Sequence, residues 1–276
     1  MRIIKKIISI LIFFLIKIKI FKLPKKSLRV LMFHNISDIM NFKNQINLLK
    51  KDWKFINPDH FYKILDGKKK INGRYLLLTF DDGFKSNIYV AEKILKKLKL
   101  KAIFFVPIKF VLMKDKKLIK KFIKNNLKVN SVENEMKKLN LKDLKKLKKM
   151  DFVIGAHTYS HKNLKKINDK KILNYEIIQS ANKLQKLLNI KIDNFSFNFG
   201  RLNDISYKSL LLSKKRFKYI FTAIRGENLN EQKIIFRDNV IPEDGTYELY
   251  TYLSGYLDFI YSKEKKIIEK IYHKIF

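Results

Sequence analysis

Two adjacent carboxylates, Asp81 and Asp82, are the side chains of this sequence that first suggest chemistry. They follow the apolar run 75–80, which is long enough for a buried strand and too short for a helix, and Gly83 then permits a sharp turn. Because two carboxylates this close repel each other, one must be neutralised or have its pKa raised. A divalent metal bound by one carboxylate, with the other left as a general base, would meet both demands. A helix cap or a turn is the structural alternative, because aspartate favours both.

Two histidines, His157 and His161, stand four residues apart in the segment HTYSH. That spacing puts both rings on one face of a helix, and a tight turn after Gly155 could do the same. Taken alone, the pair is explained as well by core histidines as by a metal site. The chain holds only five histidines, however, and these two end a short strand just as the aspartates do. Two imidazoles and one carboxylate would form a three-ligand site that leaves room for water on zinc, cobalt or nickel.

The elements expected to position these residues alternate between strand and helix. Strands that run parallel bring their carboxyl ends to one edge, where enzymes of this architecture carry their chemistry. The order, without a Gly-, Ser- or Pro-rich break after residue 27, predicts one α/β domain over residues 28–276, built as a single distorted (β/α) barrel. The predicted strands are 27–36, 75–80, 101–107, a short strand within 151–161 that runs into the two histidines, 194–201, 217–223 and 234–241. The helical segments are 41–65, 87–98, 112–150, 171–188 and a closing helix.

The N-terminal segment 1–27 has a composition of its own, with lysines on both sides of the apolar centre 7–16. A secretory signal has this form, but no small-residue cleavage site follows. A full membrane span needs about 20 apolar residues. An uncleaved signal-anchor, an interfacial helix and a buried first helix therefore all stay open. We expect membrane attachment at the cell envelope, with the side of the membrane undetermined.

The chain is strongly basic, with 61 Lys and Arg against 25 Asp and Glu, a net charge of +36. The lysines are spread along the sequence beside abundant Ile and Asn, as in a general compositional bias. Because no nucleic-acid-binding motif accompanies them, we expect solvated lysine faces and no nucleic-acid partner, while attraction to anionic lipid or an acidic glycan stays open. The absence of cysteine excludes disulfides, thiolate metal sites and cysteine nucleophiles.

Several of these segments resemble the polysaccharide deacetylase family, the NodB-homology carbohydrate esterases. LLLTFDDGFKSN is similar to the first family motif, HTYSH matches its H-S/T-x-x-H motif, and KAIFFVP resembles a strand between them. The likeness covers roughly residues 29–241. It implies the barrel fold of that family and a metal-dependent hydrolase that removes N-acetyl groups from the amino sugars of a polysaccharide or glycan.

The resemblance also implies a role for each matching residue. Asp82 would bind the metal together with the two histidines of HTYSH, most readily Zn²⁺, with Co²⁺ or Ni²⁺ possible. Asp81 would be the general base that deprotonates the attacking water. Phe199, in the segment FNFGR, would donate its backbone N–H to the oxyanion, although Asn198 stands where proline is common.

The general acid is harder to place, because the C-terminal third holds only His273, which we expect at the surface. A permuted branch, which resembles the poly-N-acetylglucosamine deacetylases, carries the acid on its first strand. His34 in VLMFHNI fits that branch, with a buried structural histidine as the alternative. Arg237 in IIFRDNV matches a family arginine that would keep Asp81 ionised by charge pairing, with a surface arginine as the alternative.

Rival functions stay open beside this hypothesis. The same site could deacetylate or deformylate a lipid-linked sugar, which the membrane-seeking N-terminus favours. A non-catalytic, basic glycan- or membrane-binding protein with a decayed site is a second rival, although the intact carboxylates and histidines argue against decay. A nucleic-acid-binding protein is the third.

Overall fold

The computed structural model describes residues 2–129, 137–241 and 243–275 of the 276-residue chain. Its centre is a nine-stranded sheet with the spatial order β8-β7-β6-β5-β4-β3-β1-β9, and β2 pairs with β3 beside this path. Within the described residues, every pairing between these strands is parallel. The strands are β1 Ser27–Phe33, β2 Lys54–Phe55, β3 Arg74–Phe80, β4 Ala102–Val106, β5 Val153–Ala156, β6 Asn194–Ser196, β7 Tyr219–Phe221, β8 Ile234–Ile235 and β9 Asp238–Asn239.

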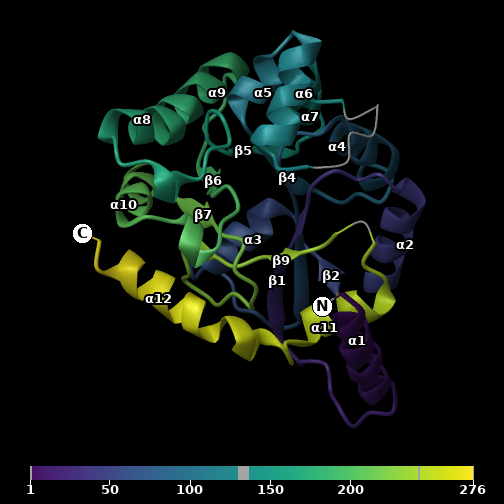
Figure 1. Cartoon of the computed structure of the whole chain (residues 1–276). Helices are drawn as coiled ribbons and strands as arrows, with labels where there is room; N and C mark the ends of the chain where they lie inside the picture. The colour runs from purple at the N-terminus through teal and green to yellow at the C-terminus, as the bar shows by residue number, and fades with distance from the viewer. Residues whose placement is uncertain (1, 130–136, 242, 276) are drawn as a thin grey trace.

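The two edges of this sheet meet in one stretch of chain. β8 pairs with β7, β9 pairs with β1, and only Phe236 and Arg237 separate β8 from β9. The sheet therefore curls round into the distorted barrel that the sequence predicts (Figure 1). The single strand expected over 234–241 is wrong in detail, because the chain changes its pairing partner midway and forms two short strands.

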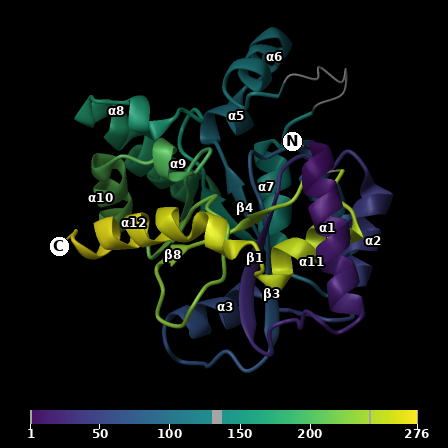
Figure 2. The same ribbon diagram turned by 60° about the horizontal axis from the view of Figure 1, so that its bottom comes forward.

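Helices cover the outside of the barrel in both ribbon views (Figures 1 and 2). Most of the longer ones bury one face and expose lysines on the other, as an amphipathic surface helix does; α11, which has no lysine, and α1, whose outer face is apolar, differ. Their bounds are α1 Arg2–Lys17, α2 Ile39–Leu49, α3 Pro58–Leu65, α4 Lys85–Val90, α5 Ile108–Leu112, α6 Lys116–Asn125, α7 Leu141–Lys149, α8 Lys170–Asn174, α9 Ser180–Leu188, α10 Tyr207–Arg216, α11 Thr246–Ser254 and α12 Ser262–His273.

Four predicted helical segments are subdivided. Segment 41–65 holds α2, then β2, and then α3, which begins at Pro58 because proline suits the first turn of a helix. Segments 87–98 and 171–188 each contain one π-helical turn, at Ala91–Leu95 and Tyr175–Gln179. Segment 112–150 contains α6 and α7 as separate helices, and its residues 130–136 lie outside the described part of the chain.

Side chains alternate between the two faces of each strand, and both faces are buried. One set forms a cluster within the barrel, where Phe105 of β4 contacts Phe221 of β7 although these strands are not neighbours. The other set packs under the surrounding helices. Gly155 lies inside β5 and not in a turn, and a Cβ there would come within 2.4 Å of the Phe105 ring. The barrel interior is thus filled up to the ends of its strands.

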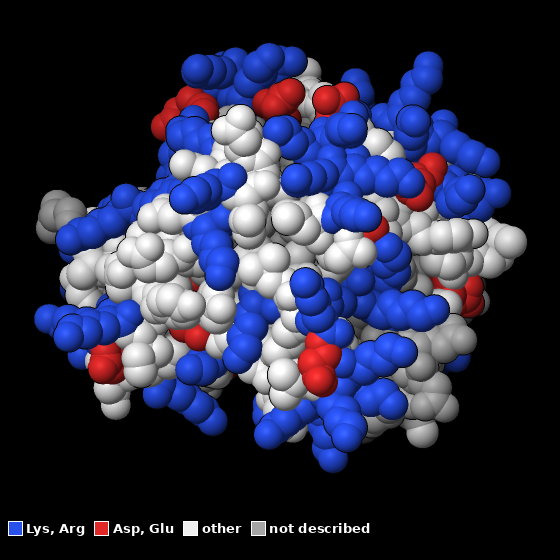
Figure 3. Space-filling model, turned by 90° about the horizontal axis from the view of Figure 1, so that it is seen from above, with Lys and Arg blue, Asp and Glu red and all other residues white. Residues whose placement is uncertain are grey.

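The N-terminal helix α1 packs against α11, where the ring of Phe13 meets those of Tyr247 and Tyr250 edge-on. Within the described residues, no helix combines the length and apolar character that a membrane span requires. The separation of residues 1–27 from the domain 28–276 stays a prediction. Lysine and arginine side chains spread over the whole face seen in Figure 3, with a few acidic side chains among them.

Candidate metal centre and active site

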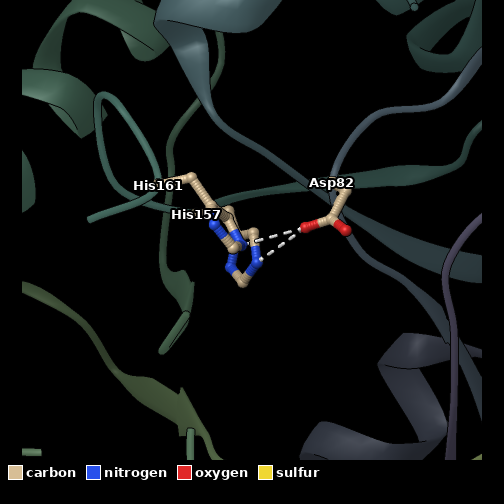
Figure 4. Close-up of side chains that lie close together, drawn as sticks. All are labelled: Asp82, His157 and His161. Atoms are coloured by element: carbon tan, nitrogen blue, oxygen red, sulfur yellow. Dashed lines mark ion pairs between the residues drawn. The ribbon is translucent and has the colours of Figure 1, made fainter. Parts of the chain in front are cut away.

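Three side chains predicted as metal ligands meet at the carboxyl ends of the strands (Figure 4). Asp82 follows β3, whereas His157 and His161 follow β5. The Oδ1 atom of Asp82 lies 3.1 Å from Nε2 of His161 and 3.4 Å from Nε2 of His157. All three side chains are buried, so water alone does not solvate the charge.

The spacing of these atoms fits a metal ion. Oxygen and nitrogen ligands about 2.0–2.1 Å from Zn²⁺ in a tetrahedron lie about 3.3 Å apart, close to both distances from Asp82. The Oδ1 atom of Asp82 is buried and has no hydrogen-bond partner among the described residues. The donor set of one carboxylate and two imidazoles suits zinc, cobalt or nickel and does not distinguish them.

Backbone carbonyls hold both rings in the tautomer that a metal needs. Nδ1 of His157 lies 2.8 Å from the carbonyl oxygen of Ser196, and Nδ1 of His161 lies 2.9 Å from that of Asn126. Because a carbonyl can only accept, each Nδ1 carries the proton and each Nε2 presents its lone pair toward Asp82. Asn126 is the C-cap of α6, so the segment 112–150, predicted only as helical, also supports the site.

Hydrogen bonds within the turn and from the side chain of Glu176 hold the tight turn between the two histidines. The Thr158 hydroxyl accepts a hydrogen bond from the His161 N–H at 3.0 Å, which gives the second position of HTYSH a structural task. Both residues adopt the left-handed backbone region, with φ of 61° and 55°. The buried Glu176 carboxylate accepts from the backbone N–H groups of Tyr159, at 3.1 Å, and Ser160, at 2.8 Å. These bonds stabilise a strained conformation that would otherwise relax.

Asp81 forms a different kind of contact from its neighbour. Arg237 donates to both of its carboxylate oxygens at 2.8 Å, and the Ser196 hydroxyl donates to Oδ2 at 3.1 Å. Burial alone would raise the pKa of Asp81, but the charges of Arg237 and His157 outweigh it and hold this pKa below its usual value. Asp81 is therefore a buried carboxylate kept ionised, with Oδ2 3.8 Å from Nε2 of His157.

The same balance holds at Asp82. Burial would raise its pKa, yet His161 and His157 hold the pKa well below the usual range. In return, Asp82 outweighs the effect of burial on His161 and raises the pKa of that imidazole. The aspartate pair is thus divided, one facing an arginine and the other two imidazoles. DDG does form a turn, with φ of 72° at Asp82 and 74° at Gly83, but neither aspartate is the N-cap of α4, which is Phe84.

A cavity of about 370 Å³ opens above these groups. His34, which follows β1 and is half-buried, lies in its wall together with both aspartates. Phe199 lines it as well, with φ of 59° and its ring 5.0 Å from that of His161. The cavity therefore brings together the predicted base, acid, oxyanion donor and metal ligands.

Asn198, which stands where the family commonly has proline, links two loops of the site. Its Nδ2 donates to the Thr158 hydroxyl at 2.8 Å and to the carbonyl oxygen of Lys162 at 2.9 Å. Proline could make neither bond. The departure therefore replaces a rigid ring with a hydrogen-bonded tie between the Phe199 loop and the histidine turn.

The structure decides between some of the earlier alternatives. Arg237 is fully buried, so the surface-arginine alternative is wrong, whereas His273 is exposed as expected. Sequence reasoning missed Ser196 and Glu176. Neither has a motif signal of its own, because one acts from a short strand and the other from a helix that looked amphipathic and ordinary.

Comparison with known proteins agrees with this geometry. The sequence model of the polysaccharide deacetylase family matches residues 68–212, which include the DDG turn and both histidines. Among curated protein sequences, none matches the chain significantly.

Solved structures share the fold at low sequence identity. IcaB from Ammonifex degensii has a TM-score of 0.66 at 19% identity, covering 83% of this chain and 97% of its own. The deacetylase PplD from Streptococcus pyogenes, in complex with acetate, has a TM-score of 0.63 at 19% identity, with coverage of 84% and 99%. A de-N-acetylase from Aggregatibacter actinomycetemcomitans has a TM-score of 0.66 at 14% identity, with coverage of 82% and 99%.

Proposed function

Because this chain belongs to the polysaccharide deacetylase family, whose members hydrolyse non-peptide carbon–nitrogen bonds, we propose that it removes N-acetyl groups from amino sugars of a glycan. The observation that carries the proposal is the pairing, in one cavity, of the Asp82–His157–His161 cluster with the buried Asp81–Arg237 ion pair. The acetate bound by the Streptococcus pyogenes enzyme is the product that such a reaction releases.

Asp82, His157 and His161 would hold a divalent metal, for which we propose Zn²⁺. When bound, such an ion lowers the pKa of a coordinated water toward roughly 7 and polarises the acyl oxygen. Both histidines already present Nε2 to the site, because their Nδ1 protons are fixed by carbonyl groups.

Asp81 is proposed as the general base. It lies beside the ligand cluster and, held ionised by Arg237, it can accept a proton from the attacking water. A carboxylate offers about four lone-pair positions, so the bonds from Arg237 and Ser196 leave capacity for that proton.

Phe199 and His34 are proposed for the two later requirements. The Phe199 backbone N–H would donate to the oxyanion, and the tie from Asn198 to the histidine turn fixes this loop beside the ligands. His34, which follows β1 and lines the same cavity, would protonate the leaving amine; β3 and β4 separate β1 from β5 in the sheet.

The primary test is removal of a ligand. Asp82→Ala and His157→Ala should each abolish release of acetate from a soluble N-acetylglucosamine oligomer and reduce bound metal below one equivalent. Asp59→Ala and His273→Ala, which change exposed residues of the same types, serve as controls and should leave both unchanged. Full activity in metal-loaded Asp82→Ala protein would overturn the assignment.

The role of His34 has a test of its own. His34→Ala should keep the metal while turnover falls by about 10²–10⁴, the usual contribution of a general acid. Loss of the metal in this variant would instead make His34 a ligand or a structural residue. Metal content and acetate release measured on the same sample separate these outcomes.

A second candidate uses the same site on a lipid-linked sugar. The observation that favours it is the exposed apolar face of α1, treated below. Acetate and formate release from lipid-linked and polymeric substrates, compared at equal enzyme concentration, decides between the two. The non-catalytic alternative predicts no stoichiometric divalent metal in the purified protein.

A further inference from the structure

The helix α1 has one face that packs on the domain and another that does not. Toward α11 it buries Ser9 and Ile12 and places Phe13 against two tyrosine rings. The opposite face is apolar although it is exposed to solvent. Its most exposed side chains, each more than half accessible, are Ile3, Ile4, Ile7, Leu11 and Phe14.

The spacing of these residues makes one continuous surface. Positions 4, 7, 11 and 14 recur at intervals of three and four, which align on one side of an α-helix. Soluble proteins rarely expose a contiguous apolar patch of this kind without a partner. Because the other face of α1 already packs on the domain, we expect this apolar face to contact a second apolar surface.

The positive charge of α1 and of the whole chain indicates what kind of surface this is. Lys6 lies on α1, and Lys17 and Lys19 stand at its end, all exposed. The whole chain carries a net charge of +36, which opposes docking of a second copy and favours an anionic surface. An apolar helical face flanked by lysines is the pattern of a helix that lies in the interface of an anionic bilayer.

The helix also lies near the catalytic cavity. Lys6 and Phe13 line a second cavity of about 420 Å³, and Ile241 and Glu243 belong to the walls of both cavities. Figures 1 and 2 show α1 on the outside of the domain beside α11. A surface bound by α1 would therefore be close to the rim of the catalytic cavity.

We propose that α1 lies in the plane of an anionic lipid surface, with Ile7, Leu11 and Phe14 inserted, and holds the catalytic cavity beside that surface. The docking follows from α1 alone. The further consequence, that the substrate is a glycan attached to or emerging at the membrane, rests on the proposed function.

The experiment measures binding of the full-length protein to vesicles without any substrate. The triple variant Ile7→Ser, Leu11→Ser, Phe14→Ser removes the inserted side chains. The matched control Ile260→Ser, Leu229→Ser, Phe259→Ser removes the same three residue types at comparably exposed positions far from α1 in the sequence. Vesicles of phosphatidylglycerol mixed with phosphatidylcholine are compared with phosphatidylcholine alone, and thermal unfolding confirms that each protein is folded.

We expect the parent and the control to bind the anionic vesicles equally and the α1 variant to bind about 100-fold more weakly, given the transfer free energy of three apolar side chains. Equal binding of all three proteins would show that general basic charge acts alone, and would overturn the proposal. No binding by the parent, or dimerisation through α1 in place of binding, would overturn it as well. Deacetylation of a soluble oligomer should be unchanged in the α1 variant, so failure of docking is distinct from failure of the proposed function.

A second measurement does not depend on the stability of the triple variant. Phe14→Trp should gain fluorescence quenching from lipids brominated near the headgroup, and Phe259→Trp should not. Trp53 is buried and gives the same background in both proteins. Stronger quenching from bromine near the bilayer midplane would mean that α1 inserts deeply, which would overturn docking in the plane of the surface.

Discussion

Two buried arginine–aspartate pairs in this molecule are both bidentate, with similar distances, and differ in what surrounds them. Arg29 of β1 donates to both oxygens of Asp238 at 2.7 and 2.8 Å, and Arg237 donates to both oxygens of Asp81 at 2.8 Å. Arg237 and Asp238 are neighbours in sequence, so the chain supplies one member of each pair from adjacent positions. Arg237 lies at the junction between β8 and β9 and contacts Asp81, whereas Asp238 opens β9 and contacts Arg29.

The surroundings give the two pairs different tasks. Arg29 also donates a hydrogen bond to a second carboxylate, Asp258, at 2.7 Å. The Arg29–Asp238 pair is therefore surrounded by another charged side chain. Asp81 instead faces His157 and a cavity. An ion pair alone therefore does not mark an active site. What distinguishes the Asp81–Arg237 pair is its position beside His157 and the 370 Å³ cavity.

The largest effect on stability is expected from Arg29→Met. Asp238 would be left buried without its bidentate partner, which costs about 3–5 kcal/mol when one member of a buried pair is removed. Urea unfolding measures the loss, and turnover per folded molecule should change little. A loss of stability no larger than that of a surface substitution would contradict this view of the pair.

Arg237→Met should affect catalysis more than folding. Ser196 and His157 still face Asp81, so the loss of stability should be smaller than for Arg29→Met. Turnover should fall by about 10²–10³, because Asp81, the proposed base, loses the cation that keeps it ionised and oriented. The fall should appear in kcat with the metal retained. If kcat is unchanged and only stability falls, the two pairs are equivalent and the comparison fails.

Asn198→Ala tests the tie between the Phe199 loop and the histidine turn. Loss of two hydrogen bonds should lower the free energy of unfolding by about 1–2 kcal/mol. Turnover should fall by about tenfold, since each 1.4 kcal/mol of lost transition-state stabilisation corresponds to that factor. Unfolding curves and acetate release measured together check both values. A change in stability without any change in kcat would make Asn198 a purely structural residue.

The smallest effect is expected at a partly exposed group of one aspartate and two lysines. Asp66 pairs with Lys218 and Lys233; burial alone would raise its pKa, but the two lysines outweigh it and lower the pKa to about 2. Because solvent screens both lysines, Asp66→Asn should cost at most about 1 kcal/mol at neutral pH. With an unfolded pKa of about 3.9, this stability is present above that pH and is lost as the pH falls toward 2. The parent and the variant should therefore unfold alike at pH 2, as acid titration in urea can show.

The parts of the fold predicted from sequence are those with long apolar runs. β1, β3 and β4 were expected within a few residues of their observed ends, because their strands are buried on both faces. The break between β8 and β9 was not, because it depends on which strand lies alongside and not on the residues 234–241 themselves. The π-helical turns within two helices had no signal in the pattern of apolar residues.

The site divides in a similar way. Asp81, Asp82 and both histidines could be selected because the chain has only five histidines, two of them follow a predicted strand as the aspartates do, and the combination suits a metal. Asn126 and Ser196 could not, since each orients a histidine through its backbone carbonyl, which any residue possesses. Supporting contacts made by the main chain have no signature in the side-chain sequence.

The junction between β8 and β9 has a consequence for biosynthesis. Asp81 and Arg237 are 156 residues apart, and Arg29 and Asp238 are 209 apart, so both ion pairs form only after nearly the whole chain exists. Contacts this distant in sequence are formed late, because they close the longest loops. A ribosome-bound chain that ends before residue 237 already contains Asp81, Asp82, His157 and His161, but it lacks Arg237, the counter-ion of Asp81. For the proposed deacetylase, we therefore expect release of acetate to begin only after residues 234–239 have been made and the barrel has closed.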